Sequence, residues 1–281
     1  MSVEMAETRI DIKQPASGSS FYLAMRLLPR TEREAMFAVY AFCRAIDDVA
    51  DEGELSRQER RAELDRWRSD IDALYAGEVP VRLSNLAEPV RAFGLRQDDF
   101  YAAIDGVEMD VVADMRAPDL ATLDLYCDRV ASAIGRLSVR IFGMEDGAGL
   151  ELAYHLGRAL QLTNILRDLD EDAAIGRLYL PQDLLASADI EIAEPEAVIA
   201  HPRIDDACRA LAQIARHHYR QSDLILDGRP VGKLRAPKLM RAVYGAIFAK
   251  MEEQGWASPR ERARVGKAEL FWIALRHGLI G

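Results

Sequence analysis

Cysteine is scarce in this sequence, and a long apolar run is missing from it. The three cysteines are Cys43, Cys127 and Cys208. They are too few and too scattered for a disulfide framework or a zinc site, which favours a reducing cytoplasm. The apolar run at 270–275 ends at Arg276 and falls far short of the ~20 residues of a membrane-spanning helix. Residues 1–14 carry no apolar signal segment. We therefore expect a soluble cytoplasmic protein, with peripheral contact at a membrane surface left open.

Excess positive charge, repeats and linkers are also missing. The net charge of −10 over 281 residues argues against nucleic acid as a partner. It also means that an anionic substrate would need a metal ion or local arginines. No window alternates as a β-strand would, and no serine-, glycine- or proline-rich stretch divides the chain. We expect an all-α protein, with a flexible lead-in at 1–18 and one helical domain at 19–281 around a central apolar cavity.

Helical periodicity and capping signals locate the expected helices. Thr31 with Glu34, and Ser56 with Glu59, have the spacing of capping boxes. The apolar face that follows the second box consists of Leu64, Trp67, Ile71 and Leu74. The expected helices run over about 20–29, 31–53, 56–75, 84–93, 98–112, 118–143, 147–173, 203–226, 236–254 and 259–277. A loop is expected at 174–181, and a flexible connection at 228–233.

The most informative stretch is LGRALQLTNILRDLDED at 156–172. Its leucines and isoleucine predict a buried helix. Polar side chains nevertheless recur along it at intervals of three, four and four, which stacks them on one side of that helix. They are Gln161, Asn164, Asp168 and Asp172. Because unpaired amides and carboxylates cost several kcal/mol to bury, this stripe should line a wet cavity or meet a cation.

A second polar stripe lies in YAFCRAIDDVAD at 40–51. Asp47 and Asp51 are one helical turn apart, so both can approach one divalent ion, while Asp48 lies roughly a quarter-turn round the axis. Tyr40 and Arg44 continue the same stripe. Magnesium prefers one or two carboxylates, several waters and the phosphate oxygens of a substrate to an all-protein cage. Two such helices therefore suit a protein that holds diphosphates through magnesium.

Each of these features also has a plainer interpretation. The acidic clusters could be solvated helix ends, but both lie late in their helices, where the helix dipole disfavours negative charge by roughly 0.3–1 kcal/mol. Arg44 and Arg167 could hold the acids as ion-pair partners, or could grip diphosphate oxygens through two parallel hydrogen bonds. Asn164 could pair with Gln161, or could reach a metal-bound water or a phosphate. The histidines show no metal-ligand spacing and are interpreted as ordinary residues. They are His155, His201, His217, His218 and His277.

Taken together, the motifs resemble the squalene/phytoene synthase family. The motifs are YAFCRAIDDVAD at 40–51, YCDRVA at 126–131, and the stretch at 156–172 followed by GRLYLP at 176–181. The resemblance spans about 17–275. Within the family, the bacterial presqualene diphosphate synthases of hopanoid biosynthesis are most similar, through MRLLP at 25–29, IDGVEMD at 104–110, LDLYCDR at 123–129 and LYLP at 178–181. Val107 and Ala133 depart from the expected pattern, which has methionine at the first position and commonly glycine at the second.

The resemblance implies an isoprenoid synthase fold and a prenyltransferase that joins two farnesyl diphosphate molecules head to head, with Mg²⁺ or Mn²⁺ and without NADPH. The catalytic residues it implies are Asp47, Asp51, Tyr126, Asp168 and Asp172. The implied metal ligands are Asp47, Asp51, Asp168 and Asp172, supported by Asp48, Asn164 and Glu171. The implied substrate contacts are Ser20, Phe21, Tyr40, Arg44, Gln161, Asn164, Arg167, Tyr244 and Arg262. Tyr126 would face the reacting carbons, and either Tyr126 or the departed diphosphate would take the proton.

Three alternatives remain at this point. Phytoene and dehydrosqualene synthases share every motif, so the product rests on resemblance alone. A terpene cyclase typically has serine or threonine between the acids of its second metal motif, which is absent between Asp168 and Asp172. A catalytically silent helical interaction protein would be expected to have lost metal positions, and all of them are intact. Oligomeric state does not follow from the sequence.

Overall fold

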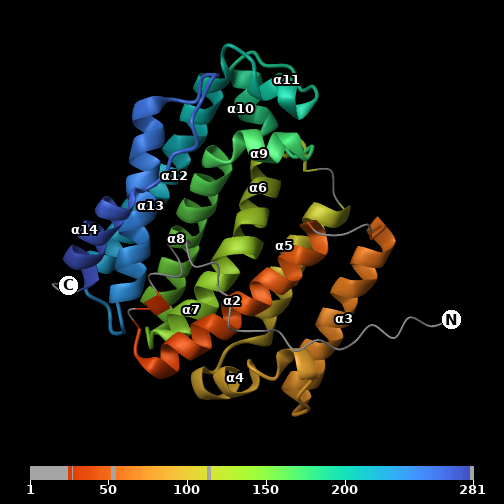
Figure 1. Cartoon of the computed structure of the whole chain (residues 1–281), viewed down its shortest axis with the longest axis vertical. Helices are drawn as coiled ribbons and strands as arrows, with labels where there is room; N and C mark the ends of the chain where they lie inside the picture. The colour runs from red at the N-terminus through yellow and green to blue at the C-terminus, as the bar shows by residue number, and fades with distance from the viewer. Residues whose placement is uncertain (1–24, 27, 52–54, 113–114, 279–281) are drawn as a thin grey trace.

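Helices form the regular structure of the chain, of which the computed structural model describes residues 25–26, 28–51, 55–112 and 115–278 (Figure 1). Within these ranges there is no strand, only an isolated β-bridge between Arg116 and Leu178. The elements in chain order are α2 (Arg30–Asp51), α3 (Arg57–Ala76), η1 (Val81–Leu83), α4 (Ala87–Phe93), α5 (Gln97–Val112), α6 (Leu120–Cys127), η2 (Asp128–Ser132), α7 (Ala133–Ile141), α8 (Asp146–Arg167), α9 (Leu169–Ala174), α10 (Gln182–Ser187), α11 (Pro195–Ile199), α12 (Ile204–Asp227), α13 (Arg235–Gln254) and α14 (Lys267–Gly278). The predicted all-α class is confirmed.

Local signals set the bounds of α3. The Ser56 hydroxyl accepts a hydrogen bond from the amide of Glu59, and the Glu59 carboxylate accepts one from the amide of Ser56, which completes the predicted capping box. Gly77 ends the helix with a φ of 98°, a left-handed conformation that favours glycine. The buried residues are the predicted Leu64, Trp67, Ile71 and Leu74. Short-range sequence information is therefore sufficient for this helix.

Helix α8 lies at the centre of the bundle (Figure 1). It packs against α7 and η2 on one side and against α12 and α13 on the other. Close packing on η2 depends on Gly157, since a Cβ atom there would lie 2.7 Å from the Cα atom of Ser132. Side chains that are buried along α8 alternate with the polar ones of the predicted stripe, so the central helix contributes both to the core and to a cavity.

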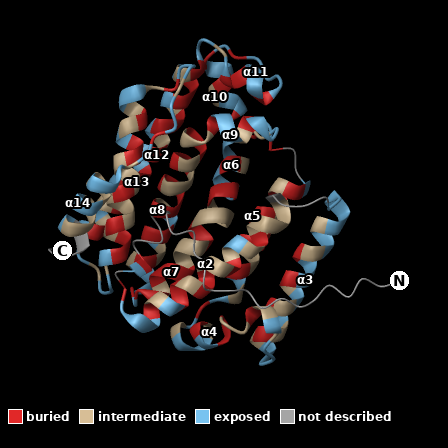
Figure 2. Cartoon of the chain, in the orientation of Figure 1, coloured by how far each residue is buried: buried red, intermediate tan, exposed pale blue. Residues whose placement is uncertain are grey.

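The buried apolar side chains form two clusters that meet on α8. One cluster packs α2 to α5 and α7 against the first half of α8, and in it the rings of Phe42 and Phe100 meet edge-on at 5.1 Å. The other packs the second half of α8 against α12 and α13, and the indole nitrogen of Trp256 donates to the carbonyl of Leu166 at 2.9 Å. Leu160 packs against both clusters. Figure 2 shows the buried residues on the inner sides of the helices.

Several expected helix bounds are wrong. Helix α2 begins at Arg30, so Thr31 lies within its first turn instead of capping it. The helix expected over 147–173 is interrupted at Asp168, whose φ of −104° and ψ of 22° separate α8 from α9. The helix expected over 118–143 contains the π-helical turn η2. The final helix begins only at Lys267, because residues 255–266 form an irregular segment whose side chains reach across to α9. The short helices α10 and α11 were not anticipated.

Two expectations concern the ends of the chain and its relation to a membrane. The predicted helix over 20–29 is described only at Met25 and Arg26, which are helical, and at 28–29. The expected lead-in at 1–18 lies outside the described residues. Among the residues that the structure describes, none of the helices has the length and apolarity that crossing a bilayer requires.

Candidate active site

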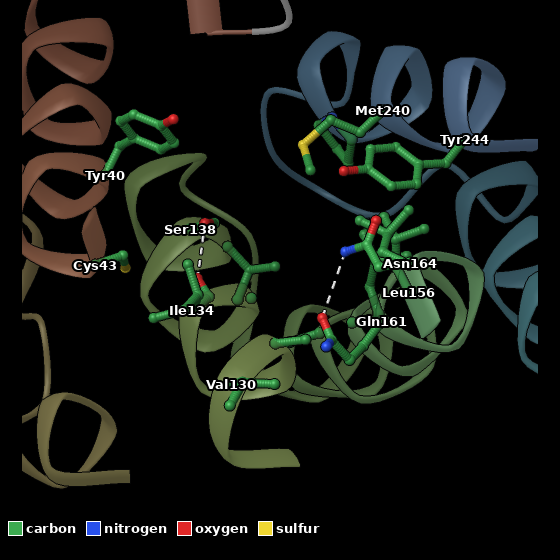
Figure 3. A pocket seen from close by; sticks show the side chains of 18 of the residues that line it. Tyr40, Cys43, Val130, Ile134, Ser138, Leu156, Gln161, Asn164, Met240 and Tyr244 are labelled. Atoms are coloured by element: carbon green, nitrogen blue, oxygen red, sulfur yellow. Dashed lines mark hydrogen bonds between the residues drawn. The ribbon is translucent and has the colours of Figure 1, made fainter. Parts of the chain in front are cut away.

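An apolar cavity of about 490 Å³ lies between α2, α7, α8 and α13 (Figure 3). Its wall is mostly aliphatic and aromatic, and includes Val130, Ile134, Leu156, Met240 and Tyr244. Tyr40 and Cys43 face it from α2. Burial raises the pKa of the Cys43 thiol well above its ordinary value, so this side chain stays a neutral packed group. Such a wall accommodates a hydrocarbon chain.

A polar chamber of about 350 Å³ adjoins the apolar cavity. Three carboxylates line it, those of Asp47, Asp110 and Asp168, together with Tyr126 and Arg177. Residues common to the linings of both spaces are Asp47, Val130 and Gln161. The two spaces therefore meet at these residues. The site thus has an apolar part and an adjacent charged part.

Helix α2 carries the first predicted stripe to this site. Tyr40, Arg44 and Asp47 line the apolar cavity, and Asp47 also lines the polar chamber. Asp48 instead pairs with Arg44 at 2.8 Å, where both side chains are about half exposed. An exposed pair of this kind is worth only ~0.3–0.5 kcal/mol, so Arg44 can exchange it for a stronger anion. Asp51 is the last residue of α2, and its side chain lies outside the described part of the chain.

The end of α8 carries the second stripe to the same place. Gln161 lines both spaces, Asn164 and Arg167 line the apolar cavity, and Asp168 lines the polar chamber. The amide nitrogen of Asn164 donates to the Gln161 side-chain oxygen at 3.4 Å (Figure 3). The side-chain oxygen of Asn164 is buried without a hydrogen-bond partner among the described residues. Because buried acceptors are nearly always satisfied, this oxygen marks a position for a donor or a cation from a ligand.

Two arginines hold the carboxylate of Asp168. The guanidinium of Arg167 donates to its two oxygens at 2.8 and 2.6 Å, and that of Arg262 reaches it from the 255–266 segment at 2.8 and 2.7 Å. Burial acts to raise the pKa of Asp168, but Arg167 and then Arg262 outweigh it, so that pKa lies below its ordinary value. Arg262 also pairs with Glu171 at 3.1 Å. Asp168 is therefore ionised and oriented.

The pKa of Asp172 is shifted in the opposite direction from that of Asp168. Burial first, then the charge of Asp168, raises its pKa to about 7; Asp110 and Glu171 add to this effect and Arg177 opposes it. Burial contributes most to this shift, and the negative charges of nearby carboxylates add to it beside a poorly solvated carboxyl group. A bound cation would relieve that charge.

Asp110, Tyr179 and Arg177 were not among the predicted site residues. The hydroxyl of Tyr179 donates to one oxygen of Asp110 at 2.7 Å, and that of Tyr126 donates to the other at 2.9 Å. Burial, together with the nearby Asp110 charge, raises the pKa of Tyr126 well above its ordinary value, so the phenol keeps its proton. These residues occur within stretches that carry the family resemblance, at 104–110 and 176–181. Asp110 lies more than 60 residues before Arg177 and Tyr179, so no local spacing could have linked it to them.

The donor atoms of the site suit a hard divalent cation. All of the candidate ligands offer oxygen, which magnesium prefers, and the site contains both an unpartnered amide oxygen and excess negative charge. No group of three or more histidine, cysteine or carboxylate side chains is arranged as a metal site within the part of the chain that is described. Magnesium commonly completes its coordination with water and with the phosphate oxygens of a substrate.

The structure brings most of the predicted residues together. Of the substrate contacts, Tyr40, Arg44, Gln161, Asn164, Arg167 and Tyr244 line the apolar cavity. Arg262 reaches the site through Asp168. Glu171 is exposed at its edge, and Asp48 points to Arg44 instead of into either space. Ser20 and Phe21 lie outside the described residues.

Comparison with known proteins shows which family has this sequence and architecture. The family model for squalene/phytoene synthase matches residues 14–269. The chain is 56% identical over 261 residues to the presqualene diphosphate synthase of Zymomonas mobilis subsp. mobilis, covering 93% of this chain and 89% of that protein. It is 52% identical over 265 residues to the presqualene diphosphate synthase of Rhodopseudomonas palustris, with 94% and 95% covered. A phytoene synthase from Cereibacter sphaeroides is 33% identical over 275 residues, with 91% and 75% covered.

Comparison with solved structures identifies the same family. A crystal structure of squalene synthase HpnC from Alicyclobacillus acidocaldarius matches with a TM-score of 0.76 at 27% identity, covering 84% of this chain and 89% of that one. A dehydrosqualene synthase in complex with a ligand matches with a TM-score of 0.79 at 25% identity, covering 92% and 89%. The protein belongs to the squalene/phytoene synthase family.

Proposed function

We propose that this protein is a prenyltransferase that condenses two farnesyl diphosphate molecules head to head into presqualene diphosphate, releasing diphosphate. Identities of 56% and 52% to presqualene diphosphate synthases support it. The observation that carries it is the joining of an apolar cavity to a charged chamber at Asp47, Val130 and Gln161, which matches a prenyl tail and its diphosphate head. A cytoplasmic location, with peripheral contact at a membrane surface, and a place in squalene or hopanoid biosynthesis belong to the same proposal.

Guanidinium groups would bind and orient the diphosphate. Arg44 and Arg167 line the cavity, and Arg177 lines the chamber. Arginine matches the oxygens of a phosphate group with two parallel hydrogen bonds. As the carbon–oxygen bond breaks, these side chains stabilise the negative charge that develops on the leaving group. The electrons of that bond leave with the diphosphate, and an allylic cation remains.

Magnesium is part of the proposal because the oxygen donors fit it. The residues that would hold it are Asp47, Asp51, Asp168 and Asp172, with Asn164 and the substrate's phosphate oxygens. Asp48 and Glu171 would act in support. When bound, magnesium would neutralise the charge on the diphosphate and so make it a better leaving group. Manganese has the same preference for oxygen ligands.

The apolar wall would protect the cation from water. Val130, Ile134 and Leu156 lie along the cavity, and Tyr40 and Tyr244 add aromatic faces. Aromatic faces attract cations, and exclusion of water prevents the cation from being quenched to an alcohol. The double bond of the second farnesyl diphosphate can then supply its electron pair to the allylic cation and form the new carbon–carbon bond.

Closure of the cyclopropane ring requires the loss of one proton. Tyr126 lies in the polar chamber, next to the junction residue Val130. Its hydroxyl donates to Asp110 at 2.9 Å. The phenolic oxygen can therefore accept the substrate proton as its own proton passes to Asp110, so that no free phenolate is required. The carbon–hydrogen electron pair closes the ring.

The product assay tests this function. The purified protein is incubated with farnesyl diphosphate and MgCl₂, with and without NADPH, and the products are analysed by mass spectrometry. We expect presqualene diphosphate in both samples, and none after chelation with EDTA until Mg²⁺ or Mn²⁺ is restored. Asp168→Asn serves as the inactive control, with its fold checked by circular dichroism. Squalene that appears only with NADPH would replace presqualene diphosphate as the final product.

Two further measurements distinguish the alternatives. A C40 product from geranylgeranyl diphosphate would identify a phytoene synthase, the activity of more distant relatives. Absence of Mg²⁺-dependent binding of a non-hydrolysable farnesyl diphosphate analogue, measured by calorimetry, would favour a catalytically silent protein.

A further inference from the structure

The helix from α6 through η2 to α7 supplies residues to both parts of the site. Tyr126 and Val130 line the polar chamber, and Val130, Ile134 and Ser138 line the apolar cavity. Figure 3 shows the last three in succession along this helix. Each is four residues from the next. One side of a single helix thus has to face the site over more than three turns.

An uninterrupted α-helix could not keep these residues aligned. At 3.6 residues per turn, each step of four residues overshoots by about 40°, which accumulates to about 120° between Tyr126 and Ser138. The turn η2 corrects this rotation. The amide of Ala133 donates to the carbonyl of Asp128, five residues earlier. The turn therefore contains more residues than an α-helical turn, and this reverses part of the accumulated rotation. The π turn is what lets Tyr126 and Ser138 face one site.

Asp128, the first residue of η2, is held by two arginines from different helices. Arg136 of α7 donates to its two oxygens at 3.1 and 3.3 Å, and Arg158 of α8 donates to one of them at 3.2 Å. Arg158 is only 4% exposed. Its guanidinium also donates to the hydroxyl of Ser132, the last residue of η2, at 3.0 Å. Both ends of the turn are therefore fixed to Arg158.

The neighbouring helices approach η2 through glycines. A Cβ atom on Gly106 of α5 would lie 2.7 Å from the Val130 side chain, and one on Gly157 of α8 would lie 2.7 Å from Ser132. Both distances are too short for real atoms. The π turn is thus enclosed on two sides by backbone and fixed by ionic hydrogen bonds, although Asp128 itself lines neither part of the site.

We propose that Asp128 is a positioning residue for the reaction: through Arg136 and Arg158 it maintains the π turn, which holds the Tyr126 hydroxyl on Asp110 and Val130 at the junction of the two spaces. If the turn relaxed to a regular α-helical turn, α6 would shift in register relative to α7. Each residue of that shift would rotate Tyr126 about the helix axis by roughly 100°. The proton acceptor would then leave its place, while the diphosphate contacts on α2 and α8 would remain. This inference rests on the proposed function, in which Tyr126 acts on the substrate.

The test compares Asp128→Asn with Asp124→Asn. Asp124 is the matched control because it accepts two hydrogen bonds from the same Arg158, at 2.7 and 2.9 Å, but lies in α6 before the π turn. Both variants remove one charge from one ionic network. We expect Asp128→Asn to lower kcat about tenfold or more with KM for farnesyl diphosphate within about twofold. We expect Asp124→Asn to keep kcat within about threefold, and Asp128→Glu to restore part of the lost kcat.

A crystal structure of Asp128→Asn provides a readout that does not depend on activity. The expected result is a Tyr126 hydroxyl outside hydrogen-bonding distance of Asp110. If Asp128→Asn does not fold, Ser132→Ala loosens the other end of the turn and should show the same kcat loss at constant KM on a smaller scale. Equal kcat in the two Asn variants, or an unmoved Tyr126, would refute the positioning role. A wild-type protein that forms no presqualene diphosphate would count against the proposed function instead.

Discussion

The phenol rings of Tyr126 and Tyr179 stack with their centroids 5.0 Å apart and their planes inclined by 18°. Both hydroxyls donate to Asp110, one to each carboxylate oxygen. Of these three residues, Tyr126 and Asp110 line the polar chamber and Tyr179 does not. Tyr179 therefore supports Asp110 without being part of the chamber lining.

This arrangement predicts unequal effects of removing the two hydroxyls. Tyr126→Phe should lower kcat by about 10²-fold or more, the usual contribution of a proton-transfer group. Tyr179→Phe should lower kcat by only about tenfold, because Asp110 loses one donor but Tyr126 remains in place. Steady-state kinetics with farnesyl diphosphate measure both. Full turnover of Tyr126→Phe with an unchanged product would withdraw the proton-transfer role of this residue.

Arg262 should set the acidic limb of the pH–activity profile. Together with Arg167 it holds the pKa of Asp168 below its ordinary value against the effect of burial. Arg262→Gln removes two contacts, at 2.8 and 2.7 Å, so the pKa of Asp168 should rise and activity should begin to fall at a higher pH. The measurement is kcat/KM against pH. Arg264→Gln is the control, since Arg264 is an exposed residue of the same segment, and its profile should match the wild type. Superimposable profiles for all three proteins would contradict the prediction.

His218 should make the folded state sensitive to mild acid. Its Nδ1 atom lies 2.9 Å from that of His155, and burial, followed by the charges of His155, Arg158 and His217, lowers its pKa from 6.5 to about 4, with Asp124 opposing. As pH falls, the unfolded chain takes up this proton before the folded one. The free energy of unfolding should therefore be undiminished above about pH 6.5 and fall by on the order of 3 kcal/mol between pH 6.5 and 4.

Urea unfolding at a series of pH values tests the His218 prediction. His218→Gln should flatten the dependence between pH 6.5 and 4, whereas His201→Gln, in a turn outside this cluster, should leave the wild-type slope. Equal slopes for the two variants would exclude His218 as the source.

Local patterns in the sequence predicted the elements whose bounds are set locally. The Ser56 cap and the apolar face of α3 depend on residues at most four positions apart, and both are present. The stripes on α2 and α8 were visible for the same reason. We could also infer that the two stripes face one site, because a polar stripe on an apolar helix needs either water or a charge partner.

Contacts between distant segments were not visible in the sequence. The interruption at Asp168 accompanies its ion pair with Arg262, 94 residues later, and the irregular course of 255–266 lets that arginine reach it. The π turn depends on the glycines of two other helices, and a periodicity of 3.6 does not reveal one additional residue in a turn. Asp110, Tyr179 and Arg177 come together only through tertiary packing.

Close packing of α8 on η2 gives a stability prediction with an internal control. Gly157→Ala would place a Cβ atom 2.7 Å from both the Cα and Oγ atoms of Ser132, and overpacking of this kind costs ~1–3 kcal/mol. Gly147→Ala, in the first turn of the same helix, meets nothing within 4 Å and should stabilise the protein by ~0.5–1 kcal/mol, because alanine is the better helix former. Urea unfolding of the two variants should therefore shift in opposite directions from the wild type. If Gly157→Ala were as stable as Gly147→Ala, η2 would have room to move away from α8, and the enclosure of the π turn by backbone would be wrong.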